Sequence, residues 1–319
     1  MSCKKFFVAF IATIFVLTSA FASAASKTID VKRSVTEVTI HQDVTFAQYL
    51  TWPEGRLKAD IFLPNVKEKV PAIVFVPGGW WITAPKGAGT QLTMKLAEEG
   101  FAVANIEYRT ITTANYIDII GDVKAAVRYL RAHADELNID KNKIAVMGAS
   151  AGGYLASMVG ATGGVKKFDF GENLDQISDV QAVVDFFGPS DLTKIGADYS
   201  EDIQKIYNAS SGPGALLVNG MGVYKGNKGG SLSDTPETAR DSNPISYIGK
   251  NTPPFLIMNG DSDTTVSPSQ SKILYDALIE KGVDADHYVI KGGGHEFVYF
   301  FQPEPFKIIV DFLNKKLRK

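Results

Sequence analysis

Hydrophobic residues along the chain form two kinds of pattern that alternate over most of its length. Short continuous apolar runs, typical of strands buried on both faces of a sheet, occur at Ala72–Val76, Ala102–Ile106, Ile144–Met147, Ala182–Phe187, Phe255–Met258 and His287–Ile290. Between these runs, helical spacing predicts helices at Ile120, Val123, Val127, Leu130 and Leu137, and over 151–159, 268–281 and 305–317. Strands that alternate with helices favour a parallel sheet with helices on both faces.

A predicted antiparallel pair precedes this alternation. Residues 35–48 and 57–63 are rich in β-forming residues, and Pro53-Glu54-Gly55 supplies a turn between them. Together with the apolar runs, the pair predicts an α/β fold with a mostly parallel sheet of about eight strands, formed by residues 25–319 as one domain. The segment 192–252 is rich in glycine, lacks clear periodicity and carries tyrosines that include Tyr199, Tyr207 and Tyr224, so we expect an insertion or lid there.

The first 24 residues are predicted to be a secretory signal peptide. Lys4 and Lys5 precede an apolar run over 6–20, and Ala22-Ser23-Ala24 is a small-residue cleavage site. We therefore expect cleavage after Ala24 and a secreted or periplasmic protein with no membrane association after cleavage. The single cysteine, Cys3, lies in this segment, so the remaining residues offer no disulfide, thiol nucleophile or cysteine metal site.

Charge argues against a nucleic-acid partner. The net charge is −2, and it becomes −4 when Lys4 and Lys5 leave with the signal. No basic tract exceeds a few residues, as a phosphate backbone would require. The composition, 45% hydrophobic and 21% charged, is that of an ordinary globular protein and does not specify an oligomeric state.

Gly148-Ala149-Ser150-Ala151-Gly152 is a G-x-S-x-G motif between a predicted strand and a predicted helix. A strand, a sharp turn and a helix in that order are what a nucleophile elbow requires. The small residues permit the turn, and the helix start supplies N–H groups and a positive dipole for a developing oxyanion. A glycine-rich loop that merely packs tightly is the alternative. We interpret Ser150 as a nucleophile.

Four histidines are candidates for the base that a serine hydroxyl needs. His133 lies in a polar helical stretch, and His41 and His287 fall within strand-like runs. His295 follows three glycines just after the last predicted strand, at the sheet edge where sites form in parallel α/β folds. We therefore expect His295 to be the base.

Three aspartates compete to orient that histidine. Asp261 and Asp263 follow the predicted strand at 255–258, and Asp191 follows the one at 182–187. Asp261 has an alternative role in shaping its turn, and Asp191 has one in capping a helix. Asp261 and Asp263 also suggest a metal pair, but no further ligand is placed near them. The residues alone leave the choice of acid open.

An oxyanion hole needs two or three converging N–H groups. The Ala151 amide is one by position, and the stretch 77–81, Pro-Gly-Gly-Trp-Trp, is the expected source of the others because it directly follows a predicted strand. Two roles are open to Trp80 and Trp81, which are core packing and an apolar wall for the substrate.

Together these motifs resemble the α/β-hydrolase superfamily, in the branch of hormone-sensitive-lipase-like esterases and bacterial acetyl and feruloyl esterases. The matching segments, in chain order, are Tyr108-Arg109, 122–131, 148–153, 187–191, 253–266 and Gly294-His295. The resemblance implies Asp263 as the acid, His295 as the base, and the N–H groups of Gly79, Trp80 and Ala151 as the oxyanion hole. In three places the chain departs from the family's pattern: Pro77 and Asn259 replace histidines, and Trp80 replaces a glycine.

The sequence therefore predicts an exported serine esterase that acts on short-chain or aromatic esters without a cofactor or metal. The resemblance and the export signal favour acetyl or feruloyl groups on plant polysaccharides as the substrate. A lipase or peptidase of the same superfamily, or a non-catalytic binding protein on the same scaffold, are the alternatives. The segment 192–252 has few long apolar runs, which argues against the extended acyl channel of a lipase.

Overall fold

The computed structural model describes residues 26–32, 34–49, 55–221 and 229–318. The chain divides into a segment that ends at Ser34 and a compact unit from Val35 to Lys319. The described residues of the first segment are exposed and form no helix or strand. The predicted cleavage site and most of the predicted turn at 53–55 lie outside the described residues.

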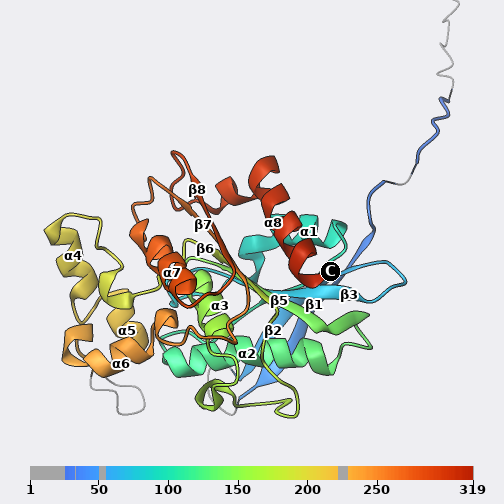
Figure 1. The fold of residues 1–319 in the computed structure, drawn as a ribbon. Coiled ribbons are helices and arrows are strands. Elements are labelled where there is room, and N and C mark those ends of the chain that lie inside the picture. The colour runs from blue at the N-terminus through green and yellow to red at the C-terminus, as the bar shows by residue number, and fades with distance from the viewer. Residues whose placement is uncertain (1–25, 33, 50–54, 222–228, 319) are drawn as a thin grey trace, which may run out of the picture. The chain divides into compact units, whose positions relative to one another are not determined.

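One eight-stranded sheet runs through the compact unit, in the order β1-β2-β4-β3-β5-β6-β7-β8 (Figure 1). The strands are β1 Val38–Gln48, β2 Arg56–Pro64, β3 Val70–Val76, β4 Ala102–Ile106, β5 Ile139–Ala149, β6 Ala182–Phe186, β7 Phe255–Gly260 and β8 Ala285–Ile290. β2 pairs antiparallel with both β1 and β4, and the remaining pairs are parallel. Each predicted strand is thus confirmed, and so is the mostly parallel sheet.

Helices cover both faces of this sheet. They are α1 Thr90–Glu98, α2 Tyr116–Ala132, α3 Ala151–Ala161, α4 Glu201–Asn208, α5 Pro213–Asn219, α6 Pro236–Asp241, α7 Ser269–Glu280 and α8 Pro303–Leu317. One hydrophobic core holds buried residues of α2, α3 and α7, and a second core holds those of α1 and α8. The predicted layering is therefore confirmed.

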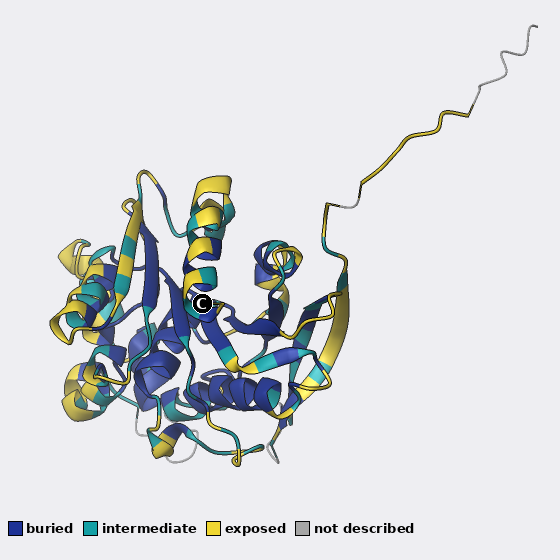
Figure 2. Cartoon of the chain, turned by 45° about the vertical axis from the view of Figure 1, so that its right-hand side comes forward, coloured by how far each residue is buried: buried dark blue, intermediate teal, exposed yellow. Residues whose placement is uncertain are grey.

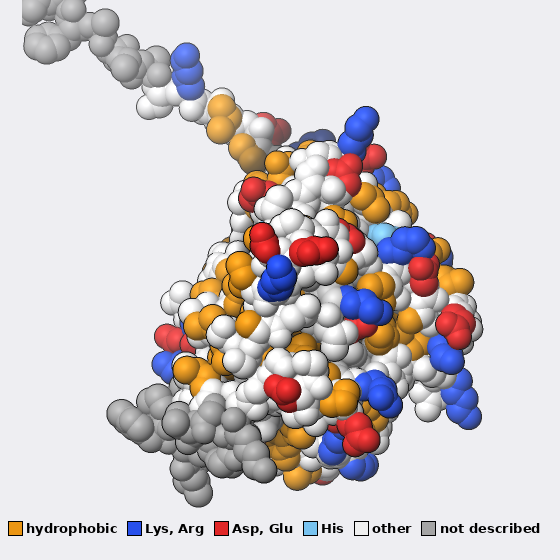
Figure 3. Space-filling model, turned by 90° about the vertical axis from the view of Figure 1, so that its left-hand side faces the viewer, with side chains coloured by type: hydrophobic (Ala, Val, Ile, Leu, Met, Phe, Trp, Pro, Cys, Tyr) orange, Lys and Arg blue, Asp and Glu red, His pale blue; other side chains and the backbone are white. Residues whose placement is uncertain are grey.

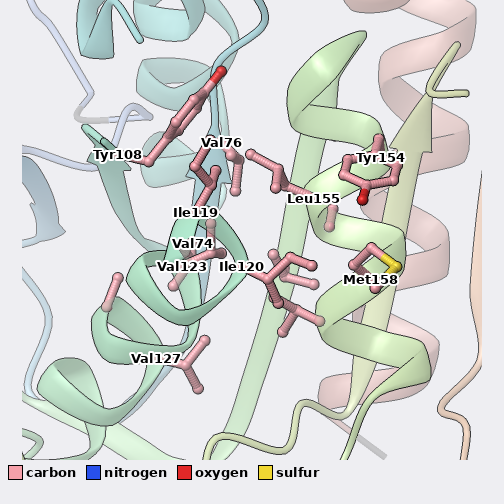
Figure 4. Packing of buried hydrophobic residues seen from close by; sticks show 14 of the residues in the cluster. Val74, Val76, Tyr108, Ile119, Ile120, Val123, Val127, Tyr154, Leu155 and Met158 are labelled. Carbon is pink, nitrogen blue, oxygen red and sulfur yellow. The ribbon is translucent and has the colours of Figure 1, made fainter. Parts of the chain in front are cut away.

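The centre of the sheet is buried on both sides. All seven residues of β3 and all eleven of α3 are buried, and Figure 2 shows this dark interior beneath more exposed outer helices. α2 and α3 both pack against β3, and in Figure 4 Ile120 of α2 lies between these two helices. Because close-packed interiors tolerate little movement, this packing fixes the turn between β5 and α3.

The start of α2 is set by a capping box. The Asn115 side chain accepts hydrogen bonds from the N–H groups of Ile117 and Asp118, and the Asp118 side chain accepts one from the N–H of Asn115. These contacts satisfy amides that the first turn of a helix otherwise leaves without partners.

The sequence prediction missed three features. α2 ends at Ala132, so Leu137 lies beyond the helix, although it is buried in the same core. α1 was not predicted, even though its apolar residues pack in the second core. The segment 192–252 holds α4, α5 and α6 in its described part, despite its weak periodicity. None of the described helices has the length and apolar character needed to span a bilayer.

Candidate active site

Ser150 lies in the turn between β5 and α3, at the edge of the sheet where the parallel strands end. Its φ of 57° falls in the left-handed region, which is costly for a residue with a side chain. Glycine is required on both sides of it. A Cβ on Gly148 would lie 2.1 Å from the carbonyl oxygen of Gly152, and one on Gly152 would lie 2.0 Å from that of Val76. The G-x-S-x-G motif therefore forms the strained turn that its sequence predicts.

A chain of hydrogen bonds joins Ser150 to two distant residues. His295 Nε2 lies 2.8 Å from Ser150 Oγ, and His295 Nδ1 lies 2.7 Å from Asp263 Oδ2. The Asp263 side chain is 1% exposed and that of His295 is 21% exposed. With the Nδ1 proton donated to Asp263, Nε2 is left to accept the proton of the serine hydroxyl. The structure thus brings together the three residues that the sequence analysis selected.

Asp263 is held in place by the backbone that follows it. Its Oδ1 accepts hydrogen bonds from the N–H groups of Thr265 at 2.8 Å and Val266 at 3.0 Å. The other carboxylate oxygen is left for the imidazole. The Tyr199 hydroxyl donates to the Asp263 carbonyl oxygen at 3.2 Å, which ties the 192–252 segment to this loop.

The two competing aspartates have structural roles. Asp261 is exposed, and its Oδ1 accepts hydrogen bonds from Gly292 N–H at 2.7 Å and from the Ser262 hydroxyl at 2.9 Å. Asp191 caps the 3₁₀ turn at Leu192–Lys194, because its Oδ1 accepts from Thr193 N–H at 3.1 Å. These contacts match the alternative roles that the sequence suggested, which are turn shaping for Asp261 and capping for Asp191.

The other histidines lie in different surroundings. His287 Nε2 is 2.7 Å from Asn259 Oδ1 on the neighbouring strand, and His133 Nδ1 is 3.0 Å from Glu136 Oε2. His41 is exposed on β1. Asn259, which replaces a histidine of the family's pattern, therefore pairs with His287. Among the described residues, no three acidic, histidine or cysteine side chains are grouped so that they could hold a metal ion.

The loop after β3 forms the other side of the site. Trp80 and Trp81 have φ values of 53° and 58°, and the Gly79 carbonyl accepts hydrogen bonds from the N–H groups of Ile82 and Thr83. The buried Tyr108 hydroxyl donates to the Pro77 carbonyl oxygen at 3.1 Å. In the part of the chain that the structure describes, the amides of Gly79, Trp80 and Ala151 donate no hydrogen bond. These three amides remain available as donors.

The two tryptophans have separate roles. Trp81 is 0% exposed, and its ring meets that of Tyr154 edge-on at 5.2 Å between centroids. The expectation of a substrate wall is therefore wrong for Trp81, because its ring points into the core. Trp80 is half-buried and lines the cavity beside Ser150.

That cavity has a volume of about 260 Å³. Its lining residues are Phe75, Gly78, Gly79, Trp80, Ala88, Ala149, Ser150, Phe187, His295 and Phe297. Ser150 and His295 supply its reactive polar atoms, and aromatic and small apolar side chains form most of the remaining wall. A compact apolar group attached to a reactive carbonyl suits such a space.

The sequence analysis did not predict that phenylalanine side chains, including Phe187 and Phe297, line the cavity. Phe187 turns out of β6 with a φ of 45°, and its ring centroid lies 4.5 Å from that of His295. Phe297 begins the 3₁₀ turn Phe297–Phe301 and packs against Phe75 and Phe186 at 5.7 and 5.4 Å. Two features of the sequence could have indicated this wall. Phe187 begins the segment 187–191 that resembles the family, and Phe297 begins an aromatic run two residues after His295.

A mostly parallel sheet with a strained serine after β5, an aspartate after β7 and a histidine after β8 defines the α/β-hydrolase fold. The chain belongs to the BD-FAE family, whose model matches residues 59–278.

Curated relatives and solved structures agree with this assignment. Esterase LipC of Mycobacterium tuberculosis is 28% identical over 235 residues, which are 71% of this chain and 53% of LipC. Probable carboxylic ester hydrolase LipM of the same organism is 32% identical over 215 residues, 65% of this chain and 44% of LipM. The chain thus spans about half the length of these relatives. A truncated carbohydrate esterase from gut microbiota matches with a TM-score of 0.75 and 30% identity, over 88% of this chain and 97% of the other.

Proposed function

We propose that this protein is a serine esterase in which Ser150 is the nucleophile, His295 the general base and Asp263 the acid that orients it. The observation that carries the proposal is the hydrogen-bond chain from Asp263 through His295 to Ser150, at the wall of an apolar cavity. The esterase names of its relatives support the same class of reaction.

The reaction follows from this arrangement. Ser150 Oγ attacks the ester carbonyl carbon while His295 Nε2 takes the hydroxyl proton, and Asp263 stabilises the resulting imidazolium. The amides of Gly79, Trp80 and Ala151 bind the oxyanion. The carbon–oxygen bond to the alcohol then breaks, and His295 gives its proton to the departing alcohol. Water repeats these steps on the acyl-enzyme, releases the carboxylic acid and restores Ser150.

Cavity size supports short or aromatic acyl groups. An engineered apolar protein cavity of about 150 Å³ holds one benzene ring. A cavity of about 260 Å³ therefore has room for a single ring with a short linker, or for a short aliphatic chain. Each further methylene gains ~0.8 kcal/mol only if it is buried. Chains of about ten carbons or more would leave methylenes in water, so acetyl and aryl-acryloyl esters fit better.

A sugar is the alcohol that we propose. A solved structure that matches over 88% of this chain is that of a truncated carbohydrate esterase from gut microbiota. Export gives access to external polysaccharides, and the basic, apolar and small-residue pattern of residues 1–24 supports export. Protein recovered outside the cytoplasm should begin at Ala25. An unprocessed N-terminus there would count against the signal.

A substrate panel tests the proposal. We expect kcat/KM to be highest for nitrophenyl acetate and other short esters or for methyl ferulate, to fall toward palmitate, and acetylated xylan to release acetate. Trp80→Gly should relax the chain-length limit, and glycine suits the left-handed φ of 53° there. A steady rise toward palmitate, with no acetate or ferulate released, would mean that the protein is a lipase.

A further inference from the structure

Three aromatic rings form a row that begins at the cavity and leads away from it. Trp80 lines the cavity beside Ser150, and the Tyr207 ring of α4 lies 6.0 Å from it between centroids. Tyr199 follows, 6.2 Å from Tyr207. All three side chains are half-buried, so each presents part of its surface to solvent. The row joins the loop after β3 to the 192–252 segment.

Contacts with neighbouring residues fix the positions of these three rings. The fully buried Trp81 meets Trp80 nearly edge-on at 6.4 Å, and the Tyr207 hydroxyl donates to the Thr265 carbonyl oxygen at 2.7 Å. Tyr199 makes the matching bond to the Asp263 carbonyl. A Cβ on Gly196 would lie 2.6 Å from the Tyr207 ring, so only glycine admits this ring position. Fixed rings lose little side-chain entropy on binding, which favours affinity.

The chemistry of the row differs from that of the acyl cavity. Phe75, Phe187 and Phe297 line the cavity with carbon, whereas the two tyrosines add oxygen atoms to the row. Because each hydroxyl donates its proton to a backbone carbonyl, its oxygen still has lone pairs that can accept a hydrogen bond. Burial raises the pKa of both tyrosines, so both hydroxyls stay protonated and uncharged.

We propose that Trp80, Tyr207 and Tyr199 bind the sugar rings on the alcohol side of the ester, as subsites for a glycan chain. This inference rests on the proposed function and specifies its leaving group. A pyranose ring has apolar C–H faces that pack on aromatic surfaces and hydroxyl edges that donate to oxygen. The acyl group occupies the cavity, so the sugar must extend outside it, where Trp80 starts the row.

Polar groups continue beyond Tyr207. A small cavity of about 80 Å³ is lined by Tyr207 together with Thr193, Lys194, Gly196, Ala197, Gln204 and Asn208. The side chains of Thr193, Lys194, Gln204 and Asn208 supply donors and acceptors for hydroxyl groups. Figure 3 views the side of the molecule on which α4, α5 and α6 lie, and acidic and basic side chains are interspersed there with apolar ones. An uncharged polyol suits such a surface better than a polyanion does.

Tyr207→Ala, Tyr207→Phe and Ile206→Ala test the proposal against two substrates, acetylated xylo-oligosaccharides and nitrophenyl acetate. Loss of the ring in Tyr207→Ala should lower kcat/KM for the oligosaccharide ester about tenfold more than for nitrophenyl acetate, through KM. Tyr207→Phe keeps the ring but loses both the bond to Thr265 and the acceptor oxygen, so it should lose less of the preference for the oligosaccharide ester than Tyr207→Ala does. Ile206 is 63% exposed on the same helix, and its variant controls for disturbance of α4.

Equal losses for both substrates in Tyr207→Ala would overturn the subsite, because they would mean that Tyr207 only supports the acid loop. A loss of preference in Tyr207→Phe as large as that in Tyr207→Ala would also overturn it, because the ring would then contribute nothing. Binding of unacetylated xylo-oligosaccharides to Ser150→Ala, followed by tryptophan fluorescence, should weaken with Tyr207→Ala, and unchanged binding would contradict the inference. Hydrolysis that persists in Ser150→Ala would instead refute the proposed function, so the two failures can be told apart.

Discussion

Two buried carboxylates of this protein each face a basic side chain, and their surroundings differ. Asp263 meets His295 at the edge of the sheet. Asp122 of α2 meets Arg109, which donates to it from Nη2 at 2.8 Å, from Nε at 3.0 Å and from its backbone N–H at 2.9 Å. The two carboxylate side chains are equally hidden, at 1% and 0% exposed.

The two pairs differ in the exposure and the chemistry of their basic residue. Arg109 is 5% exposed, its guanidinium packs on the Tyr49 ring at 4.0 Å, and an arginine does not release its proton in proteins. His295 is 21% exposed, and its second nitrogen faces Ser150 at the cavity wall. A buried pair of a carboxylate and a basic side chain thus serves structure when both ends are enclosed. It can serve chemistry when one end remains reachable and can exchange a proton.

Asp263→Asn should have the largest effect on turnover. An asparagine amide favours the wrong imidazole tautomer, so we expect kcat to fall ~10⁴-fold with the fold intact. Asp261→Asn is the matched control, because it alters an exposed turn carboxylate and should cost at most about 1–2 kcal/mol of stability. The reverse ranking of the two variants, measured as kcat on nitrophenyl acetate, would refute Asp263 as the acid.

Asp122→Asn should act on stability instead. It leaves the buried Arg109 charge without its carboxylate, which typically costs about 3–5 kcal/mol of unfolding free energy. We expect kcat of the folded fraction to change far less than in Asp263→Asn. Asp311→Asn, in an exposed pair with Lys307 on α8, should cost less than about 1 kcal/mol. Equal unfolding midpoints in urea for the two variants would mean that burial does not distinguish these pairs.

Asp185 is a third buried carboxylate, and it differs from Asp263 and Asp122 because it has no cationic partner among the described residues. It accepts hydrogen bonds from the Ser157 hydroxyl and Gly188 N–H, and burial raises its pKa to about 6. The folded protein therefore holds this proton more tightly than the unfolded chain does. The resulting stability is present below about pH 4 and is lost as the pH rises through about 6.

Asp185→Asn removes this titration. Relative to wild type, the variant should gain about 2 kcal/mol of unfolding free energy between pH 4 and pH 7. Urea denaturation of both proteins across that range measures the difference. Parallel curves for the two proteins would show that Asp185 does not titrate there.

The sequence predicted those features that depend on short-range patterns. Apolar runs predicted the strands, because central parallel strands are buried on both faces. The glycines around Ser150 predicted a sharp turn that larger residues could not form. Asp263 could not be separated from Asp261 by local pattern, because the distinction depends on which carboxylate the folded loop turns toward His295.

The remaining features depend on contacts between distant segments. Trp81 and Trp80 are neighbours in the chain, yet one packs in the core and the other lines the cavity, because successive residues of the loop point in different directions. Phe187 and Phe297 become a single wall only when β6 and the turn after β8 meet. Tyr207 similarly reaches Trp80 from a segment without clear periodicity.

Covalent labelling tests the central claim most directly. A fluorophosphonate reacts with a serine only where a base activates it and donors stabilise the oxyanion. We predict a single adduct, located by peptide mass mapping on Ser150, with parallel loss of esterase activity and no adduct in Ser150→Ala or His295→Ala. Labelling at another serine, or full esterase activity in a protein that does not react, would contradict the account.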